Sequence, residues 1–118
     1  MLSKKKGMPL LIGTVAEMLA QDVREKVPED GTFPKCAVRF RYPHSQMRGL
    51  LFVEPDLVQD GRRRLTAAAC FLNDARMVSN YLFVGSNAEI LDYLLSEAKL
   101  DEMVERFTHL QEKLQNMD

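Results

Sequence analysis

The sequence predicts an α+β fold, with an N-terminal helix, a four-stranded, mostly antiparallel meander sheet and two C-terminal helices packed on one face of the sheet. Four observations favour this class. Apolar residues recur at helical spacing near the start of the chain, alternate or form short runs between residues 36 and 84, and return to helical spacing after Ser86. The connecting segments are short, as between neighbouring antiparallel strands.

Length and composition indicate one folded domain. The chain has 118 residues, of which 46% are hydrophobic and 28% charged, a balance typical of globular rather than disordered proteins. We expect a single domain over residues 9–118 behind a flexible basic tail, residues 1–8. The apolar stretch that follows the lysines of this tail is too short for a secretory signal. No apolar run approaches the roughly 18 residues that cross a bilayer, so we expect no membrane segment.

The first helix is expected over residues 9–27. Pro9 suits its first turn, where a backbone N–H is not needed. One face of this helix carries the apolar residues Ile12, Val15, Ala16, Leu19, Val23 and Val27. Pro28 and the turn-forming residues behind it end the helix.

Two strands are expected next. Residues 36–42 alternate in character, which is typical of a half-buried strand. The alternation places three apolar side chains on one side and two arginines on the other, Val38, Phe40 and Tyr42 against Arg39 and Arg41. The apolar run of residues 49–54 predicts a second strand. We expect its Phe52 to lie in the core with the aromatic residues of the first strand.

A third and a fourth strand complete the predicted sheet. Residues 62–72 follow an Asp60-Gly61 turn and pair back as the third strand, although their three consecutive alanines also suit a helix. Residues 77–84 are rich in β-branched and aromatic residues and predict the fourth strand.

Two helices are expected at the C-terminal end. Ser86 and Glu89 have the spacing of a capping box in front of the apolar residues Ile90, Leu91, Leu94, Leu95 and Ala98. A second stripe follows, made of Leu100, Met103, Phe107, Leu110, Leu114 and Met117. At about 100° per residue, the two stripes lie roughly 200° apart on one continuous helix. We therefore predict a break between residues 96 and 99.

The second of these stripes, which we call the terminal stripe, must be buried. One alternative is that it packs on the sheet of its own chain. The other is that it forms a helix–helix interface in a homodimer or with another protein, because isolated helices of this length are marginal and methionine-rich stripes suit adaptable surfaces. The second alternative predicts a partner or dimer interface at Leu100, Met103, Phe107, Leu110, Leu114 and Met117.

Charge is distributed unevenly along the chain. Residues 35–77 contain eight basic and four acidic residues, whereas from residue 88 onward eight acidic residues outnumber three basic ones. A meander can gather four strand arginines on one surface, Arg39, Arg41, Arg62 and Arg64. Such a patch attracts phosphate, acidic peptide or nucleic acid. Alternatively, these arginines solvate an edge, prevent strand-to-strand aggregation or pair with the acidic helices.

The sequence predicts no catalytic, cofactor-binding or metal site. His44 lies in a predicted turn and His109 beside the terminal stripe, and neither belongs to a catalytic motif. Cys36 and Cys70 lack metal-binding spacing and behave as small hydrophobic residues on strands. The acidic residues between 56 and 60 lack the ligand spacing of a calcium loop.

We therefore expect a non-enzymatic protein-binding or adaptor protein, chaperone-like and self-associating as a homodimer, in a reducing cytoplasm. A strand meander beside an acidic helical end is similar, at the level of fold, to secretion-type chaperones and other small dimeric adaptors. The alternative is a nucleic-acid or polyanion binder that uses the arginine-rich sheet surface. A small enzyme that uses Cys70 or His44 is the third hypothesis.

Overall fold

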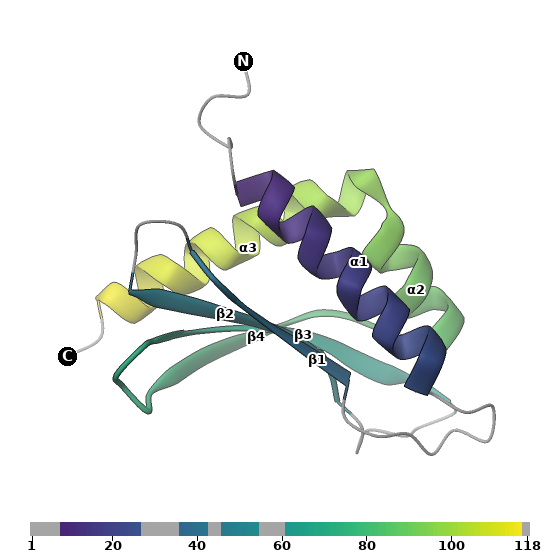
Figure 1. The fold of residues 1–118 in the computed structure, drawn as a ribbon, viewed down its shortest axis with the longest axis horizontal. Helices are drawn as coiled ribbons and strands as arrows, with labels where there is room; N and C mark the ends of the chain where they lie inside the picture. The colour runs from purple at the N-terminus through teal and green to yellow at the C-terminus, as the bar shows by residue number, and fades with distance from the viewer. Residues whose placement is uncertain (1–7, 27–35, 43–45, 55–60, 117–118) are drawn as a thin grey trace.

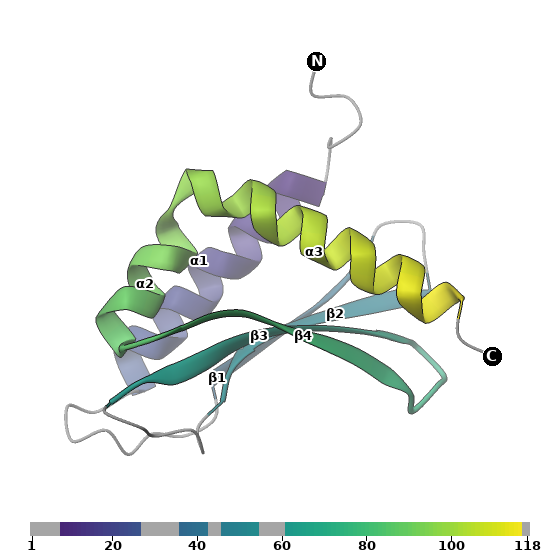
Figure 2. The ribbon, with the colours of Figure 1, turned by 180° about the vertical axis from the view of Figure 1, so that it is seen from behind.

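The computed structural model describes residues 8–26, 36–42, 46–54 and 61–116. Its elements, in order, are α1 (Met8–Lys26), β1 (Cys36–Arg41), β2 (Met47–Val53), β3 (Arg63–Phe71), β4 (Met77–Gly85), α2 (Asn87–Leu95) and α3 (Glu97–Gln115). All three helices lie on one side of the sheet, with α1 over the β1 side and α3 over the β4 side (Figures 1 and 2). The predicted α+β class is confirmed.

The four strands form an open meander in the order β1-β2-β3-β4, and every neighbouring pair is antiparallel. The alanine-rich segment is a strand rather than a helix, so the first of its two predicted alternatives is confirmed. Ala67 and Ala69 are buried on the side that α3 covers. Their small side chains allow the helix to approach β3, and this tertiary packing overrides the helix propensity of alanine.

The N-terminal helix packs on β1, β2 and both C-terminal helices. It begins at Met8, one residue before the predicted start, and ends at Lys26. Most of the predicted apolar face is buried, namely Ile12, Val15, Ala16, Leu19 and Val23. Val27 and residues 1–7 of the predicted basic tail lie outside the described residues.

The predicted capping box begins α2. The Ser86 hydroxyl accepts a hydrogen bond from the Glu89 backbone N–H (3.2 Å), and the Glu89 carboxylate accepts one from the Ser86 N–H (2.9 Å). The predicted break lies at Ser96, whose extended backbone (φ −83°, ψ 122°) separates α2 from α3. Both C-terminal helices can therefore turn their apolar stripes to one core.

The terminal stripe packs inside its own chain. Met103, Phe107, Leu110 and Leu114 are buried in the same core as the helix-facing side chains of the sheet, and Leu100 is half-buried against that core. The Phe107 ring meets Phe40 and Tyr42 of the first strand segment edge-on, at centroid distances of 5.2 and 6.2 Å. The remaining member, Met117, lies outside the described residues. The five described members of the stripe therefore pack as the first alternative predicts, against the sheet of their own chain.

One predicted core residue lies on the other side of the sheet. Phe52 is paired with Ala37 on β1 and Thr66 on β3, and all three face away from the helices. The alternation from the buried Leu51 and Val53 turns Phe52 outward. The expectation that Phe52 lies in the core is therefore wrong.

No helix in the described part of the chain is both long and apolar enough to cross a membrane.

Candidate functional site

One face of the sheet is covered by no described element, and we call it the open face (Figures 1 and 2). Strand register assigns the side chains that it carries. They are Ala37, Arg39 and Arg41 from β1, Arg48, Leu50 and Phe52 from β2, Arg64, Thr66, Ala68 and Cys70 from β3, and Met77, Ser79, Tyr81 and Val84 from β4. The predicted arginine-rich sheet surface falls on this face.

Apolar side chains occupy much of the open face. Met77, Tyr81 and Val84 of β4 are 54%, 49% and 38% exposed. Leu50 and Phe52 of the central strand β2 are half-buried. Clustered apolar surface of this kind is typical of interaction sites rather than of ordinary protein exterior. The open face is therefore the main candidate for contact with another molecule.

Three arginines gather at the β1–β2 end of this face. Arg41 of β1 is the cross-strand partner of Arg48 of β2, and Arg39 stands opposite Leu50 in the same ladder. Arg39 and Arg41 are exposed, and Arg48 is half-buried. We call Arg39, Arg41 and Arg48 the basic cluster. The predicted second strand begins at residue 49 and therefore does not include Arg48. Extending the alternation by two residues toward the hairpin would have placed it on this face.

Arg62 and Arg64 do not join the basic cluster. Arg64 lies two strands and four residues away from Arg39, a separation of roughly 15 Å. Its guanidinium donates to the Tyr81 hydroxyl (2.6 Å) and lies over the Tyr81 ring, 4.4 Å from the centroid. Arg62 donates to the Val84 carbonyl oxygen (3.0 Å). The predicted set of four arginines is thus divided between two places on the sheet.

No acidic residue in the described part of the chain forms an ion pair with the basic cluster. Among the same residues, the buried Arg48 Nε has no hydrogen-bond acceptor. Asp74 is close by, but Arg76 binds its carboxylate (Nη2 to Oδ2, 2.8 Å) and thereby lowers the pKa of Asp74. The positive charge of the cluster is therefore available to a ligand.

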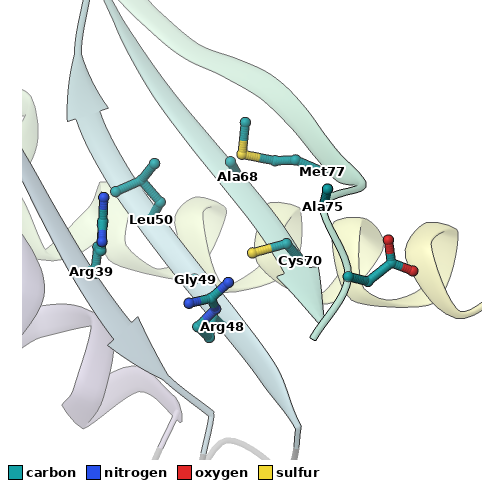
Figure 3. Close-up of a pocket in the computed structure, with 9 residues that line it drawn as sticks. Arg39, Arg48, Gly49, Leu50, Ala68, Cys70, Ala75 and Met77 are labelled. Carbon is teal, nitrogen blue, oxygen red and sulfur yellow. The ribbon is translucent and has the colours of Figure 1, made fainter. Parts of the chain in front are cut away.

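A shallow hollow of about 360 Å³ lies beside the cluster on the open face. Figure 3 shows Arg39, Leu50 and Cys70 on the near side of the sheet, with α3 behind it. The hollow is lined by Arg39, Arg48, Gly49, Leu50, Ala68, Cys70, Asp74, Ala75 and Met77. The hollow combines apolar walls with the guanidinium groups of Arg39 and Arg48, and its one carboxylate, Asp74, is already paired with Arg76. This lining suits a side chain that is apolar along its length and acidic at its tip.

The remaining candidate residues lie apart from one another. Cys36 is buried, and burial raises the pKa of its thiol. Cys70 is half-buried on the open face, whereas His109 is exposed on α3, on the other side of the sheet. His44 and residues 56–60 lie outside the described residues. Within the described ranges, three or more His, Cys, Asp or Glu side chains nowhere gather as metal ligands would.

Comparison of the chain with protein families, with curated proteins and with solved structures finds no match.

Proposed function

We propose that this chain is a non-enzymatic protein-binding domain, of adaptor or chaperone-like type, that acts in the cytoplasm and binds its partners through the open face. The observation that carries the proposal is the row of exposed apolar side chains on a sheet face that no described element covers, with Met77 and Tyr81 about half exposed. Burial of apolar surface is the main favourable term in protein association, and this face offers more of it than isolated exposed residues would.

A second copy of the chain is one partner that we propose for this face. The terminal stripe is covered by its own sheet, so self-association would use the open face instead. Two sheets stacked face to face about a two-fold axis would bury Phe52 and Met77 in each copy.

The test uses two methionines of equal exposure. Met77 on the open face and Met18 on α1 are each 54% exposed, so Met77→Glu and Met18→Glu introduce the same charge on opposite layers. We expect Met77→Glu to abolish the concentration-dependent dimer in sedimentation and the recovery of co-purifying protein, while Met18→Glu leaves both unchanged. Equal behaviour of the two variants, or a chain that stays monomeric and recovers no partner, would remove the proposal.

Binding of a polyanion is the second candidate function. It is favoured by two aromatic side chains, Phe52 and Tyr81, that share the open face with the basic cluster, since single-stranded nucleic acids stack on aromatics beside basic residues. The net charge of −1 and the acidic exposed surface of α3 oppose it. Affinity for a mixed-sequence oligonucleotide that falls steeply with salt would support this function, and binding that is absent or independent of salt would exclude it.

A further inference from the structure

The two edges of the sheet differ in their backbone groups. On β4, the carbonyls of Tyr81 and Val84 already accept hydrogen bonds from the side chains of Arg106 and Arg62. Both carbonyls point away from β3. The residues opposite Tyr81 and Val84 are Thr66 and Arg64, and these direct their own backbone groups to β2. Side chains that occupy edge carbonyls hinder the addition of another strand. The β4 edge is therefore partly closed.

The β1 edge is open in the described part of the chain. The hydrogen bond from the Tyr42 N–H to the Met47 carbonyl (3.2 Å) fixes which groups of β1 point to β2. In an antiparallel ladder every second residue turns both its N–H and its C=O to the same neighbour. The backbone N–H and C=O groups of Ala37, Arg39 and Arg41 therefore point outward, and no described residue forms a hydrogen bond with these groups.

The side chains at this edge alternate in chemistry. Arg39 and Arg41 project on the open face, where no described acidic residue forms an ion pair with the basic cluster. Val38 and Phe40 project on the helix-covered face, where they are only partly buried at the rim of the core. An added strand would meet guanidinium groups on one face and apolar surface on the other. Such a strand needs acidic and apolar residues in alternation.

We propose that the β1 edge binds an extended acidic segment of a partner protein as a fifth, antiparallel strand. Acidic side chains of that segment would pair with Arg39 and Arg41, and its apolar side chains would extend the core beside Val38 and Phe40. Addition of a peptide to an exposed sheet edge is a common recognition mode, in which the backbone supplies affinity and the side chains supply specificity. The inference rests on the proposed function and names the chemistry of its partner.

A second copy of β1 fits this edge poorly. A pairing of two β1 strands that uses all three outward residues centres on Arg39 and sets the two copies of that arginine opposite each other. Like charges directly opposite on one face destabilise a strand pair. An acidic strand at the same place replaces this repulsion with attraction, so charge selects a partner other than the chain itself.

The first experiment measures the affinity of the intact chain for a fluorescein-labelled peptide in which Glu and Val alternate over about eight residues, a typical strand length. The comparison peptides are one with Lys in place of Glu and one with the same residues in scrambled order. We expect the Glu peptide to bind at least about tenfold more tightly than either. Equal binding of the three peptides, or displacement of the Glu peptide by an oligonucleotide, would overturn the inference.

A charge-reversal variant distinguishes loss of the binding site from misfolding of the chain. The double variant Arg39→Glu with Arg41→Glu should no longer bind the Glu peptide and should bind the Lys peptide instead. An unfolded chain would not show this reversal of preference. The matched control, Arg24→Glu with Lys113→Glu, makes the same charge change at exposed helical positions and should retain the preference for Glu. A double edge variant that keeps the Glu preference would overturn the inference.

Backbone methylation tests strand addition itself. In an antiparallel pairing, the residues of the peptide that bond to β1 carry their side chains on the same face as Arg39, so they are the Glu residues. N-methylation of the Glu amides should abolish binding, whereas N-methylation of the Val amides should leave it within about twofold. If N-methylation of the Glu amides and of the Val amides affected binding equally, the peptide would not be bound as a fifth strand. If no peptide binds while Met77 remains necessary for partner recovery, this inference fails and the proposed function stands.

Discussion

Arg41 and Arg48 face each other across β1 and β2 on the open face, two like charges in direct cross-strand register. Such a pair destabilises a sheet by roughly 0.2–1 kcal/mol relative to neutral residues. An electrostatically unfavourable pair of this kind is typical of a functional surface, where binding supplies the missing opposite charge.

Neutralising one of these arginines should therefore stabilise the isolated chain. We expect Arg48→Gln to raise the free energy of unfolding by a few tenths of a kcal/mol, up to about 1 kcal/mol, as measured by urea denaturation at low ionic strength. The gain should shrink at high salt, because salt screens the repulsion. Arg24→Gln, at an exposed site on α1, serves as the control and should change little. A loss of stability in Arg48→Gln would show that Arg48 is satisfied within the fold.

Gly49 should tolerate no side chain. Its cross-strand partner is Phe40, and a Cβ atom on Gly49 would overlap the Phe40 ring. Gly49→Ala must displace a ring that packs on Phe107, and we expect a loss of about 1–3 kcal/mol. The control is Gly13→Ala in α1, where the nearest atom to the new methyl, on Leu100, is 3.9 Å away. That variant should gain up to about 1 kcal/mol, since alanine favours helix. If thermal unfolding showed that Gly49→Ala and Gly13→Ala change the stability in the same direction, this packing would be contradicted.

Phe107 should be essential to folding rather than to association. It is fully buried and meets the aromatic rings of Phe40 and Tyr42. Phe107→Ala should cost about 3–5 kcal/mol, a large part of the stability of a domain of this size. Glu105→Ala, at an exposed position of the same helix, should stay within about 0.5 kcal/mol of the parent chain. Chemical denaturation would distinguish them, and a folded Phe107→Ala chain that merely dissociates would contradict the burial of the terminal stripe.

The capping box should make stability depend on pH in a defined direction. The backbone N–H of Ser86 donates a hydrogen bond to the Glu89 carboxylate, and this bond is the main cause of the lowered pKa of Glu89. A carboxyl group with a lowered pKa in the folded state contributes stability above its unfolded pKa and loses it as the pH falls through the folded value. The melting temperature of the parent chain should therefore exceed that of Glu89→Gln at neutral pH, and the difference should shrink below about pH 4.5. If the difference in melting temperature grew as the pH fell, the hydrogen bond between the Ser86 N–H and the Glu89 carboxylate would be contradicted.

Local patterns were sufficient to predict most of the fold. The capping box and the break at Ser96 depend on neighbouring residues only, so spacing predicts them directly. The alanine-rich strand was ambiguous, because its identity depends on the strands beside it rather than on its own propensity. The apolar spacing of the terminal stripe suits a core and a coiled coil equally, and the sheet in front of it decides between them.

The candidate site was harder to predict, because it depends on register. An unbroken apolar run does not reveal which side chains face outward, so it does not distinguish Phe52 from the core-facing Leu51 and Val53. Arg48 joins Arg41 through the closure of the hairpin, which the Tyr42 to Met47 hydrogen bond fixes. Alternation alone places Arg64 on the same face as Arg39, but the hydrogen bond to Tyr81 holds the Arg64 guanidinium away from the basic cluster.

Amide hydrogen exchange along β1, followed residue by residue by NMR on the isolated chain, tests most directly whether this side of the sheet is open to a partner. The amides of Val38, Phe40 and Tyr42 bond to β2 and should exchange slowly, whereas those of Ala37, Arg39 and Arg41 point outward and should exchange fast. This alternation is the predicted result. Uniform protection of all six amides would mean that the edge is already covered, and would contradict an open β1 edge.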